Sequence, residues 1–429
     1  MNTIEMPHRR SVLWVLYVAG LLVLVVLLVV WMNLRGEAPL DSGASMKVEA
    51  NPELIAQGAY LARAGNCMGC HSAPGQAKYA GGHGVETPFG TVFAPNITPD
   101  PKTGIGDWSA AEFWRAMHHG RSKDGRLLYP AFPYPSYTNV TREDSDALFA
   151  YLRTVQPVEQ ANRAHDLPFP YNTQAALAVW RALFFSAGAL QPDAQKSDEW
   201  NRGRYLVEGL THCAACHSSR NFLGATRLNA EFAGGLMPDE AWYAPSLASP
   251  NEAGLQRWPR DQAVKLLKSG VSAHASVSGP MADVVFNSTQ YLTVQDLTAM
   301  VEYLANIRER ENDTSKAPQA ASEALGRGAK VYEQQCESCH GNKGQGVPDI
   351  YPALAGNRAV LLEHPNNLVQ IIRKGGFLPT TAGNPQPFGM PPFGQVLSDE
   401  DIAAVTTFIR QAWGNAAPGV STLDVHKIK

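Results

Sequence analysis

The sequence predicts an all-α fold of three small domains in tandem behind a single N-terminal transmembrane helix. Three observations predict it: one five-residue motif occurs three times, a segment with helical periodicity and a capping residue follows each copy, and a long uncharged apolar run lies near the N-terminus. A chain of 429 residues is too long for one core, and a domain size of about 150 residues gives three units. The 37 glycines and 30 prolines fit short helices joined by long ordered loops.

The repeated motif is CxxCH, at residues 67–71, 213–217 and 336–340. Each thiol can add to one vinyl group of a haem, and the adjacent His then faces the iron as proximal ligand. A single copy could also be a redox pair or half of a zinc site, but all six cysteines belong to these motifs. The sequence therefore predicts three covalently bound haem c groups. The attachment residues are Cys67, Cys70, Cys213, Cys216, Cys336 and Cys339, and the proximal ligands are His71, His217 and His340.

The N-terminal apolar run covers residues 12–32, twenty-one positions without a charge, which is long enough to cross a bilayer as a helix. A cleaved secretory signal is the alternative, but the run exceeds a normal signal core and no small-x-small cleavage site follows at once. Arg9 and Arg10 precede the run and favour a cytoplasmic N-terminus. We expect a single-pass protein of the bacterial inner membrane with its haem domains in the periplasm. Covalent haem attachment of this kind is associated with the periplasm.

Boundaries follow from composition and from the motif positions. We expect an anchor at 1–36, a tether at 37–50, cytochrome domains at 51–165, 166–312 and 322–416, a linker at 313–321 and a C-terminal tail at 417–429. Each domain closes with an amphipathic helix, at 142–154, 293–308 and 398–412, which a Ser or Thr followed by an acidic residue would cap. The apolar segment 173–187 is too short to span a membrane, so it is expected to be a packed helix.

A glycine and then an aromatic residue precede each motif. We expect the glycine to permit close approach of the closing helix and the aromatic ring to pack on that helix. The glycines are Gly58, Gly203, and Gly326 with Gly328, and the aromatic residues are Tyr60, Tyr205 and Tyr332.

A closed electron-transfer haem needs a sixth iron ligand, and a Met thioether opposite His raises the reduction potential. Such a Met should lie well after CxxCH and before the closing helix. Met390 lies between Gly389 and Pro391, and Met281 follows Pro280, so proline stiffens the backbone beside each sulfur. The sequence predicts Met281 and Met390 as the sixth ligands of the second and third haems.

The first domain departs from this pattern, because Phe132 occupies the corresponding place and cannot ligate iron. Met117, His118 and His119 precede it on an expected helix that begins near Ala110. Among them His118 is the preferred candidate; His83, Met68 and a five-coordinate iron are further alternatives. A His in place of Met would lower the potential of that haem.

Several longer stretches together resemble a known family, the membrane-bound tri-haem cytochrome c subunits of bacterial periplasmic dehydrogenases, of the alcohol dehydrogenase type. The resemblance covers most of residues 51–414 and rests on stretches 87–90, 95–100, 129–137, 279–282, 351–357 and 390–393. It implies three class I cytochrome c domains, with His71, His217 and His340 as proximal and Met281 and Met390 as distal ligands. The family usually has Met where this chain has Phe132, so the resemblance transfers no sixth ligand to the first domain.

The resemblance also implies a function. In the family, electrons pass from a catalytic dehydrogenase subunit, which is a quinoprotein, flavoprotein or molybdenum enzyme, to membrane ubiquinone or a terminal oxidase. Related cytochromes serve enzymes that oxidise alcohols, aldehydes, sugar acids or N-heterocycles. By this reading the chain is an electron-transfer subunit and not itself an enzyme.

Two other functions stay open at this stage. The first is a haem enzyme, such as a peroxidase or reductase, with an open iron beside Phe132. The second is the cytochrome subunit of a terminal oxidase. No GxGxxG loop follows an expected strand, and a net charge of -3 gives no indication of nucleic-acid binding.

Overall fold

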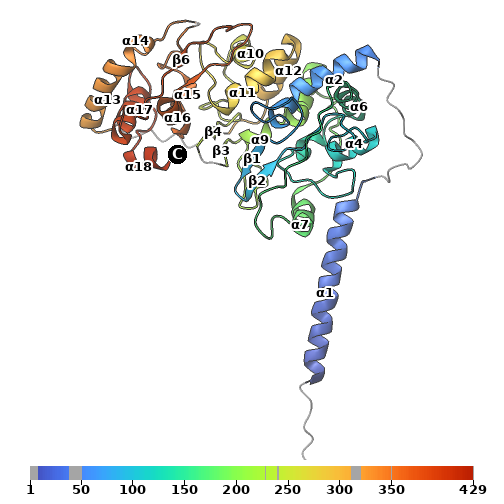
Figure 1. The fold of residues 1–429 in the computed structure, drawn as a ribbon. Helices are drawn as coiled ribbons and strands as arrows, with labels where there is room; N and C mark the ends of the chain where they lie inside the picture. Colours follow the sequence, from blue (N-terminus) through green and yellow to red (C-terminus); the bar gives the residue numbers. More distant parts are fainter. Residues whose placement is uncertain are drawn as a thin grey trace, which may run out of the picture.

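The computed structural model describes residues 8–37, 51–227, 229–238, 241–310, 320–348 and 350–428. Most of the expected tether, at 38–50, and most of the expected linker, at 313–319, lie outside these residues. Helix α1 (His8–Leu34) projects from a body of short helices and long loops (Figure 1). Three two-stranded antiparallel sheets also occur in the described part: β1 (Gly84–Thr87) with β2 (Gly90–Phe93), β3 (Gly235–Leu236) with β4 (Tyr243–Ala244), and β5 (Gly376–Phe377) with β6 (Gly389–Met390).

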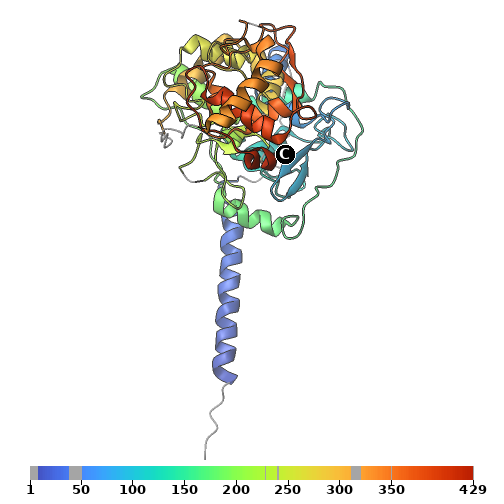
Figure 2. The same ribbon diagram turned by 90° about the vertical axis from the view of Figure 1, so that its left-hand side faces the viewer.

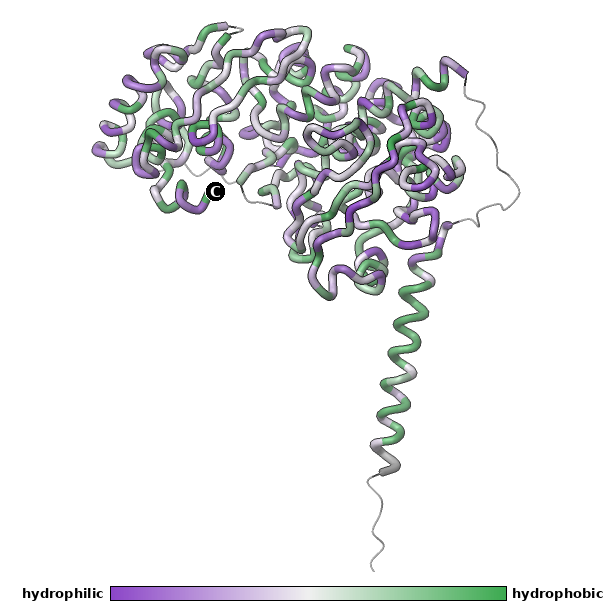
Figure 3. Tube along the Cα trace, in the orientation of Figure 1, coloured by the Kyte–Doolittle hydropathy of each residue, from purple (hydrophilic) through white to green (hydrophobic). Residues whose placement is uncertain are grey.

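Helix α1 is apolar over most of its length, and the tube in Figure 3 is mostly green there. Within Ser11–Leu34 the most apolar window of 18 residues has a mean hydropathy of 3.1, and none of that window is buried against the body. A helix that is apolar on every side is stable only where something apolar surrounds it. By length and composition α1 is therefore able to cross a membrane.

The first unit contains α2 (Pro52–Ala64), α3 (Cys67–Cys70), α4 (Ala110–His119), α5 (Tyr134–Tyr137) and α6 (Arg142–Leu152). Local sequence sets the ends of the longer helices. Asn51 caps α2, Ser109 and Glu112 form a capping box on α4, and Thr141 caps α6. Gly120 ends α4 in the left-handed conformation with φ of 58°.

The second unit contains α7 (Gln174–Phe184), α8 (Asp198–Arg204), the π-helical turn η1 (Tyr205–Leu210) and α9 (Ala214–His217). It continues with α10 (Arg260–Ser269), α11 (Pro280–Asn287), the 3-10 turn η2 (Thr289–Tyr291) and α12 (Val294–Ala305).

The third unit contains α13 (Ser322–Gln335), α14 (Glu337–His340), α15 (Arg358–Leu361), α16 (Asn366–Lys374), α17 (Asp399–Gln411) and α18 (Thr422–Lys427). Helix α18 lies within the stretch 417–429 that was expected to be a tail. It packs on α17 and buries Val425 in the core of the third unit, so this unit extends at least to α18.

The same helix crossing occurs in each unit, where α2 packs on α6, α8 on α12, and α13 on α17. A glycine lies at every crossing, and a Cβ there would overlap a backbone carbonyl of the facing helix. The pairs are Gly58 with Ala147, Gly203 with Ala299, and Gly328 with Ala404. The expected role of the glycines is confirmed, and in the third unit it belongs to Gly328, because Gly326 faces open space.

The described residues have two hydrophobic cores. One runs without a break through the first and second units and includes Leu61, Leu148, Leu206 and Leu297. The other belongs to the third unit and includes Ile402. The chain is therefore built as a fused pair of units and a separately packed third.

Candidate haem-binding sites

The cysteines and histidine of each CxxCH motif lie on one tight helical turn. The amide of the histidine donates to the carbonyl of the first cysteine, at 3.0 Å in all three copies, His71 to Cys67, His217 to Cys213 and His340 to Cys336. This bond brings the two thiols and the imidazole of a motif together. The sequence pattern is thus expressed as one structural element, repeated three times.

Each motif histidine is held by a proline carbonyl. The Nδ1 atoms of His71, His217 and His340 lie 2.8, 2.7 and 3.0 Å from the carbonyl oxygens of Pro95, Pro245 and Pro352. A carbonyl only accepts, so Nδ1 carries the proton and Nε2 keeps its lone pair for a metal. Burial lowers the pKa of all three imidazoles, which favours the neutral form that binds iron.

The state of the thiols argues against a redox-active dithiol. No disulfide joins any two of the six cysteines. Burial raises the pKa of Cys67 to about 12 and the pKa values of Cys213 and Cys336 to about 11. A reactive CxxC pair needs the opposite, a lowered thiol pKa.

One cavity, with a volume of about 2720 Å³, contains the first motif. Cys67, Cys70 and His71 line it together with Phe113 of α4 and Phe132, and it extends to Cys216 of the second motif. Cys70 and Cys216 are near enough that Cys216 adds to the effect of burial in raising the pKa of Cys70. A largely apolar cavity with thiols and an oriented imidazole fits a covalently attached haem, so the residues present suit the expected cofactor.

The two expected methionine ligands lie at distinct local structures. Met390 is on β6, opposite Gly376 of β5, and packs half-buried on the third core. Met281 is half-buried in the first turn of α11, where it follows Pro280 and the N-cap residue Gly279, whose φ is 51°. Their assignment as iron ligands stays a prediction.

Helix α4 directs its three possible ligands to different surroundings. Met117 is buried, packs in the shared core and lines the cavity of the first motif, as does Phe113 one turn earlier. His118 is not among the residues that line this cavity. Its ring stacks on Trp114, with centroids 4.3 Å apart, and burial and then His119 lower its pKa to about 4.

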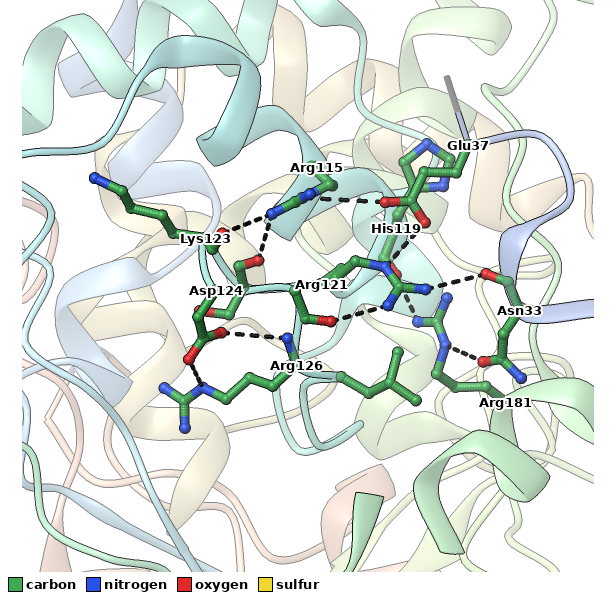
Figure 4. A network of polar contacts seen from close by, with 12 residues as sticks. Asn33, Glu37, Arg115, His119, Arg121, Lys123, Asp124, Arg126 and Arg181 are labelled. Atoms are coloured by element: carbon green, nitrogen blue, oxygen red, sulfur yellow. Dashed lines mark hydrogen bonds and ion pairs between the residues drawn. The ribbon is translucent and has the colours of Figure 1, made fainter. Parts of the chain in front are cut away.

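His119 lies on a third side of α4, beside a buried polar cluster that joins α1 to the body (Figure 4). We call Asn33, Glu37, Arg115, Arg121 and Arg181 the anchor cluster. Burial, and next the charges of its three arginines, lower the pKa of His119 to about 4.

The anchor cluster connects α1 with α4 and α7. Glu37 forms an ion pair with Arg121 at 2.9 Å and lies 4.0 Å from Arg115. Arg181 of α7 donates to Asn33 Oδ1 at 3.0 Å and to the carbonyl of His119. Sequence reasoning did not find this cluster, because its members carry no motif and come together only through tertiary packing.

Comparison with known proteins places these features in a family. The family model "Cytochrome c" matches residues 55–156, and the model "Cytochrome C oxidase, cbb3-type, subunit III" matches residues 323–409. The chain is 42% identical over 398 residues to the cytochrome c subunit of alcohol dehydrogenase (quinone) from Gluconacetobacter polyoxogenes, covering 89% of this chain and 85% of the relative.

Two further relatives belong to other dehydrogenases. The gluconate 2-dehydrogenase cytochrome c subunit of Pantoea cypripedii is 40% identical over 391 residues, which cover 87% of this chain and 89% of the relative. The fructose dehydrogenase cytochrome subunit of Gluconobacter japonicus is 34% identical over 434 residues, which cover 94% of this chain and 87% of the relative. The chain therefore belongs to the family of cytochrome c subunits of dehydrogenase complexes, the family of the cytochrome c subunit of quinone-dependent alcohol dehydrogenase.

Proposed function

We propose that this chain is a tri-haem c-type cytochrome that carries electrons from a periplasmic catalytic dehydrogenase to ubiquinone or a terminal oxidase. The observation that carries the proposal is the threefold repetition of one site: the CxxCH turn with its histidine Nδ1 donating to a proline carbonyl. Haem supplies the iron that changes oxidation state. The residues of the chain attach it, orient its ligands and exclude water.

The second unit is the one that neither family model covers, and its structure supports a haem there. It has the same histidine contact as its neighbours, to Pro245, and the same glycine crossing, at Gly203. Its CxxCH turn also closes with the same backbone bond, from His217 to Cys213. Three tandem cytochrome c domains therefore account for the chain better than two.

Haem stoichiometry tests this count. The purified full-length chain should contain three haems by the pyridine haemochrome assay, and peptides with residues 67–70, 213–216 and 336–339 should each carry the mass of one. Exchanging Cys213 and Cys216 for Ser should reduce the number from three to two. Two haems in the unchanged protein would contradict the proposal.

For the irons we propose His71, His217 and His340 as proximal ligands and Met281 and Met390 as the sixth ligands of the second and third haems. For the first haem the cavity favours Met117 over His118, because Met117 lines the space beside His71 and Phe132. The thioether of Met117 on α4 would take the place of the methionine ligand that the family usually has at the position of Phe132. The first iron would then be closed like the other two.

The donor we propose is a quinoprotein, flavoprotein or molybdenum dehydrogenase that oxidises an alcohol, aldehyde, sugar acid or N-heterocycle. We place the haem units in the periplasm and α1 in the inner membrane. The lining of the first cavity also includes Met32 of α1, Arg35 directly after α1, and Phe184 of α7. These residues support access for a lipid-soluble quinone.

Purification of the tagged chain from its native membrane tests the partnership. A stoichiometric dehydrogenase subunit, whose substrate reduces all three haems, is the expected result. Reoxidation by a short-chain ubiquinone in the absence of oxidase would identify quinone as the acceptor. Reoxidation only after addition of a terminal oxidase would identify the oxidase instead.

A second candidate, a haem enzyme at the first site, is favoured by Phe132 alone. An open iron at the first site would bind carbon monoxide when it is reduced. One of the three haems in each chain should then bind it. Absence of such binding in the native chain would exclude it, whereas turnover of peroxide by the isolated chain would support it.

A further inference from the structure

Helix α7 lies at the side of the body from which α1 projects (Figures 1 and 2). Exposed apolar residues surround it. We call Phe169, Tyr171, Val179, Leu183 and Phe184 the α7 face. Phe169 is 81% exposed, Leu183 63% and Val179 48%. Single exposed apolar residues are common on proteins, but five around one helix and its preceding loop need an apolar partner.

The exposed side of α7 carries no charged side chain. Val179 and Leu183 are four residues apart and so lie on one side of the helix. Leu177 and Ala182 are buried against the body. The one charged residue of α7, Arg181, also points inward, to the anchor cluster. Outward-facing apolar and inward-facing charged side chains are the reverse of the pattern of a helix that faces water.

Contacts hold α7 at the level where the apolar span of α1 ends. Asn33 Nδ2 donates to the carbonyl of Ala178 at 2.9 Å, and Arg181 Nε donates to Asn33 Oδ1 at 3.0 Å. Arg35 Nη2 donates at 3.0 Å to the Oγ of Ser186, which lies two residues after the end of α7. Figure 2 shows α7 lying across the end of α1, and the two helices are in contact. A bilayer around α1 would therefore have its surface beside α7.

We propose that the α7 face inserts into the surface of the bilayer that α1 spans, with lipid as its occupant. The inference rests on the proposed membrane anchorage of α1. Helices that lie in the interface bury one apolar side among the acyl chains, and aromatic residues such as Phe169 and Tyr171 are suited to the headgroup boundary. The body would then be attached at two places. All five residues of the α7 face are also in the lining of the first cavity, so this part of the cavity would lie beside lipid.

Photocrosslinking to lipid tests the proposal in the full-length haem-loaded chain. The protein is reconstituted in nanodiscs of phosphatidylethanolamine and phosphatidylglycerol, with benzoylphenylalanine in place of Leu183 or Phe169. Matched controls carry it in place of Leu423 on α18, 59% exposed, or Phe377 on β5, 71% exposed. Leu22 within α1 serves as the positive control for the span.

We expect lipid adducts at Leu183 and Phe169 in yields several-fold above those at Leu423 and Phe377. Adducts at Leu22 with only control yields at Leu183 and Phe169 would overturn the inference and leave the anchor standing. Absence of adducts at Leu22 would overturn the anchor, and the inference with it. The unsubstituted protein gives a second readout: addition of lipid should slow amide hydrogen exchange in 174–184 and leave 422–427 unchanged, and equal exchange in both segments would also contradict the proposal.

Discussion

The hydroxyl of Tyr60 in α2 donates a hydrogen bond of 2.6 Å to Asp296 at the start of α12, in the second unit. The reverse contact also exists, because Tyr205 of the second unit donates at 2.5 Å to Asp144 at the start of α6, in the first unit. Each tyrosine follows the crossing glycine of its own unit by two residues. The two units thus exchange equivalent contacts, as a pair related by approximate twofold symmetry would.

Asp296 should make the stability of this pair depend on pH. Burial alone would raise its pKa, but hydrogen bonds from Arg202 and Tyr60 outweigh that effect and hold it below the usual value. A lowered folded-state pKa stabilises the protein above the unfolded-state pKa, and this contribution is lost as pH falls through the folded value. Asp296→Asn should therefore lower the free energy of unfolding by about 1.5 to 3 kcal/mol at pH 7, and by less at acid pH.

Thermal unfolding of the two proteins between pH 3 and 7 checks this expectation. The difference in Tm should shrink as the pH falls below the ordinary carboxyl range of about 4. Tyr60→Phe combined with Asp296→Asn should cost less than the two single changes added together. A Tm difference that is constant with pH would contradict the role of the carboxylate.

Gly58→Ala should destabilise the first unit, because its Cβ would overlap the carbonyl oxygen of Ala147 and force α2 and α6 apart. We expect the free energy of unfolding to fall by about 1 to 3 kcal/mol or more, as it does when other protein cores are overpacked. Gly326→Ala is the matched control, since a Cβ there meets nothing within 4 Å and alanine favours the helix by up to about 1 kcal/mol. Equal effects of the two changes on Tm would contradict the close crossing.

The ligand proposed for the first haem can be tested by comparing two neighbours on α4. Met117→Leu should remove one of three methionine-to-iron charge-transfer signals in near-infrared magnetic circular dichroism and lower one reduction potential. His118→Ala should leave both unchanged. Loss of the signature with His118→Ala, or three intact signals with Met117→Leu, would count against Met117.

Arg121→Gln should weaken the attachment of α1 to the body, because it leaves Glu37 with Arg115 alone, 4.0 Å away. Removal of one partner of a buried ion pair lowers the free energy of unfolding by about 3 to 5 kcal/mol. The exposed ion pair of Lys102 and Glu159 should contribute only between about 0 and 1 kcal/mol to it. Limited proteolysis between α1 and α2 should become faster in Arg121→Gln and stay unchanged in Lys102→Gln. Equal rates would contradict the cluster's role.

Features that depend on local chemistry could be predicted from the sequence. The CxxCH turns, the cap at Ser398 and the crossing glycines each follow from a few adjacent residues. Helix α7 was likewise expected as a packed helix and does pack on α1.

Features that depend on distant partners could not be predicted. The sequence gives no sign that Tyr60 reaches Asp296, which is 236 residues away. The orientation of α4 is likewise set by its packing, so the preference for His118 over Met117 could not be judged from spacing alone. Choosing between Gly326 and Gly328 required the position of α17, which no local pattern reveals.

The division into two cores has an evolutionary consequence. The third unit meets the second through polar contacts such as those of Asn367 with the backbone of Tyr243, 2.8 Å in each direction. It could be gained, lost or exchanged as a module without uncovering much of its neighbour's interior. The first two units form one inheritable block, because deletion of either would expose part of their common interior to water.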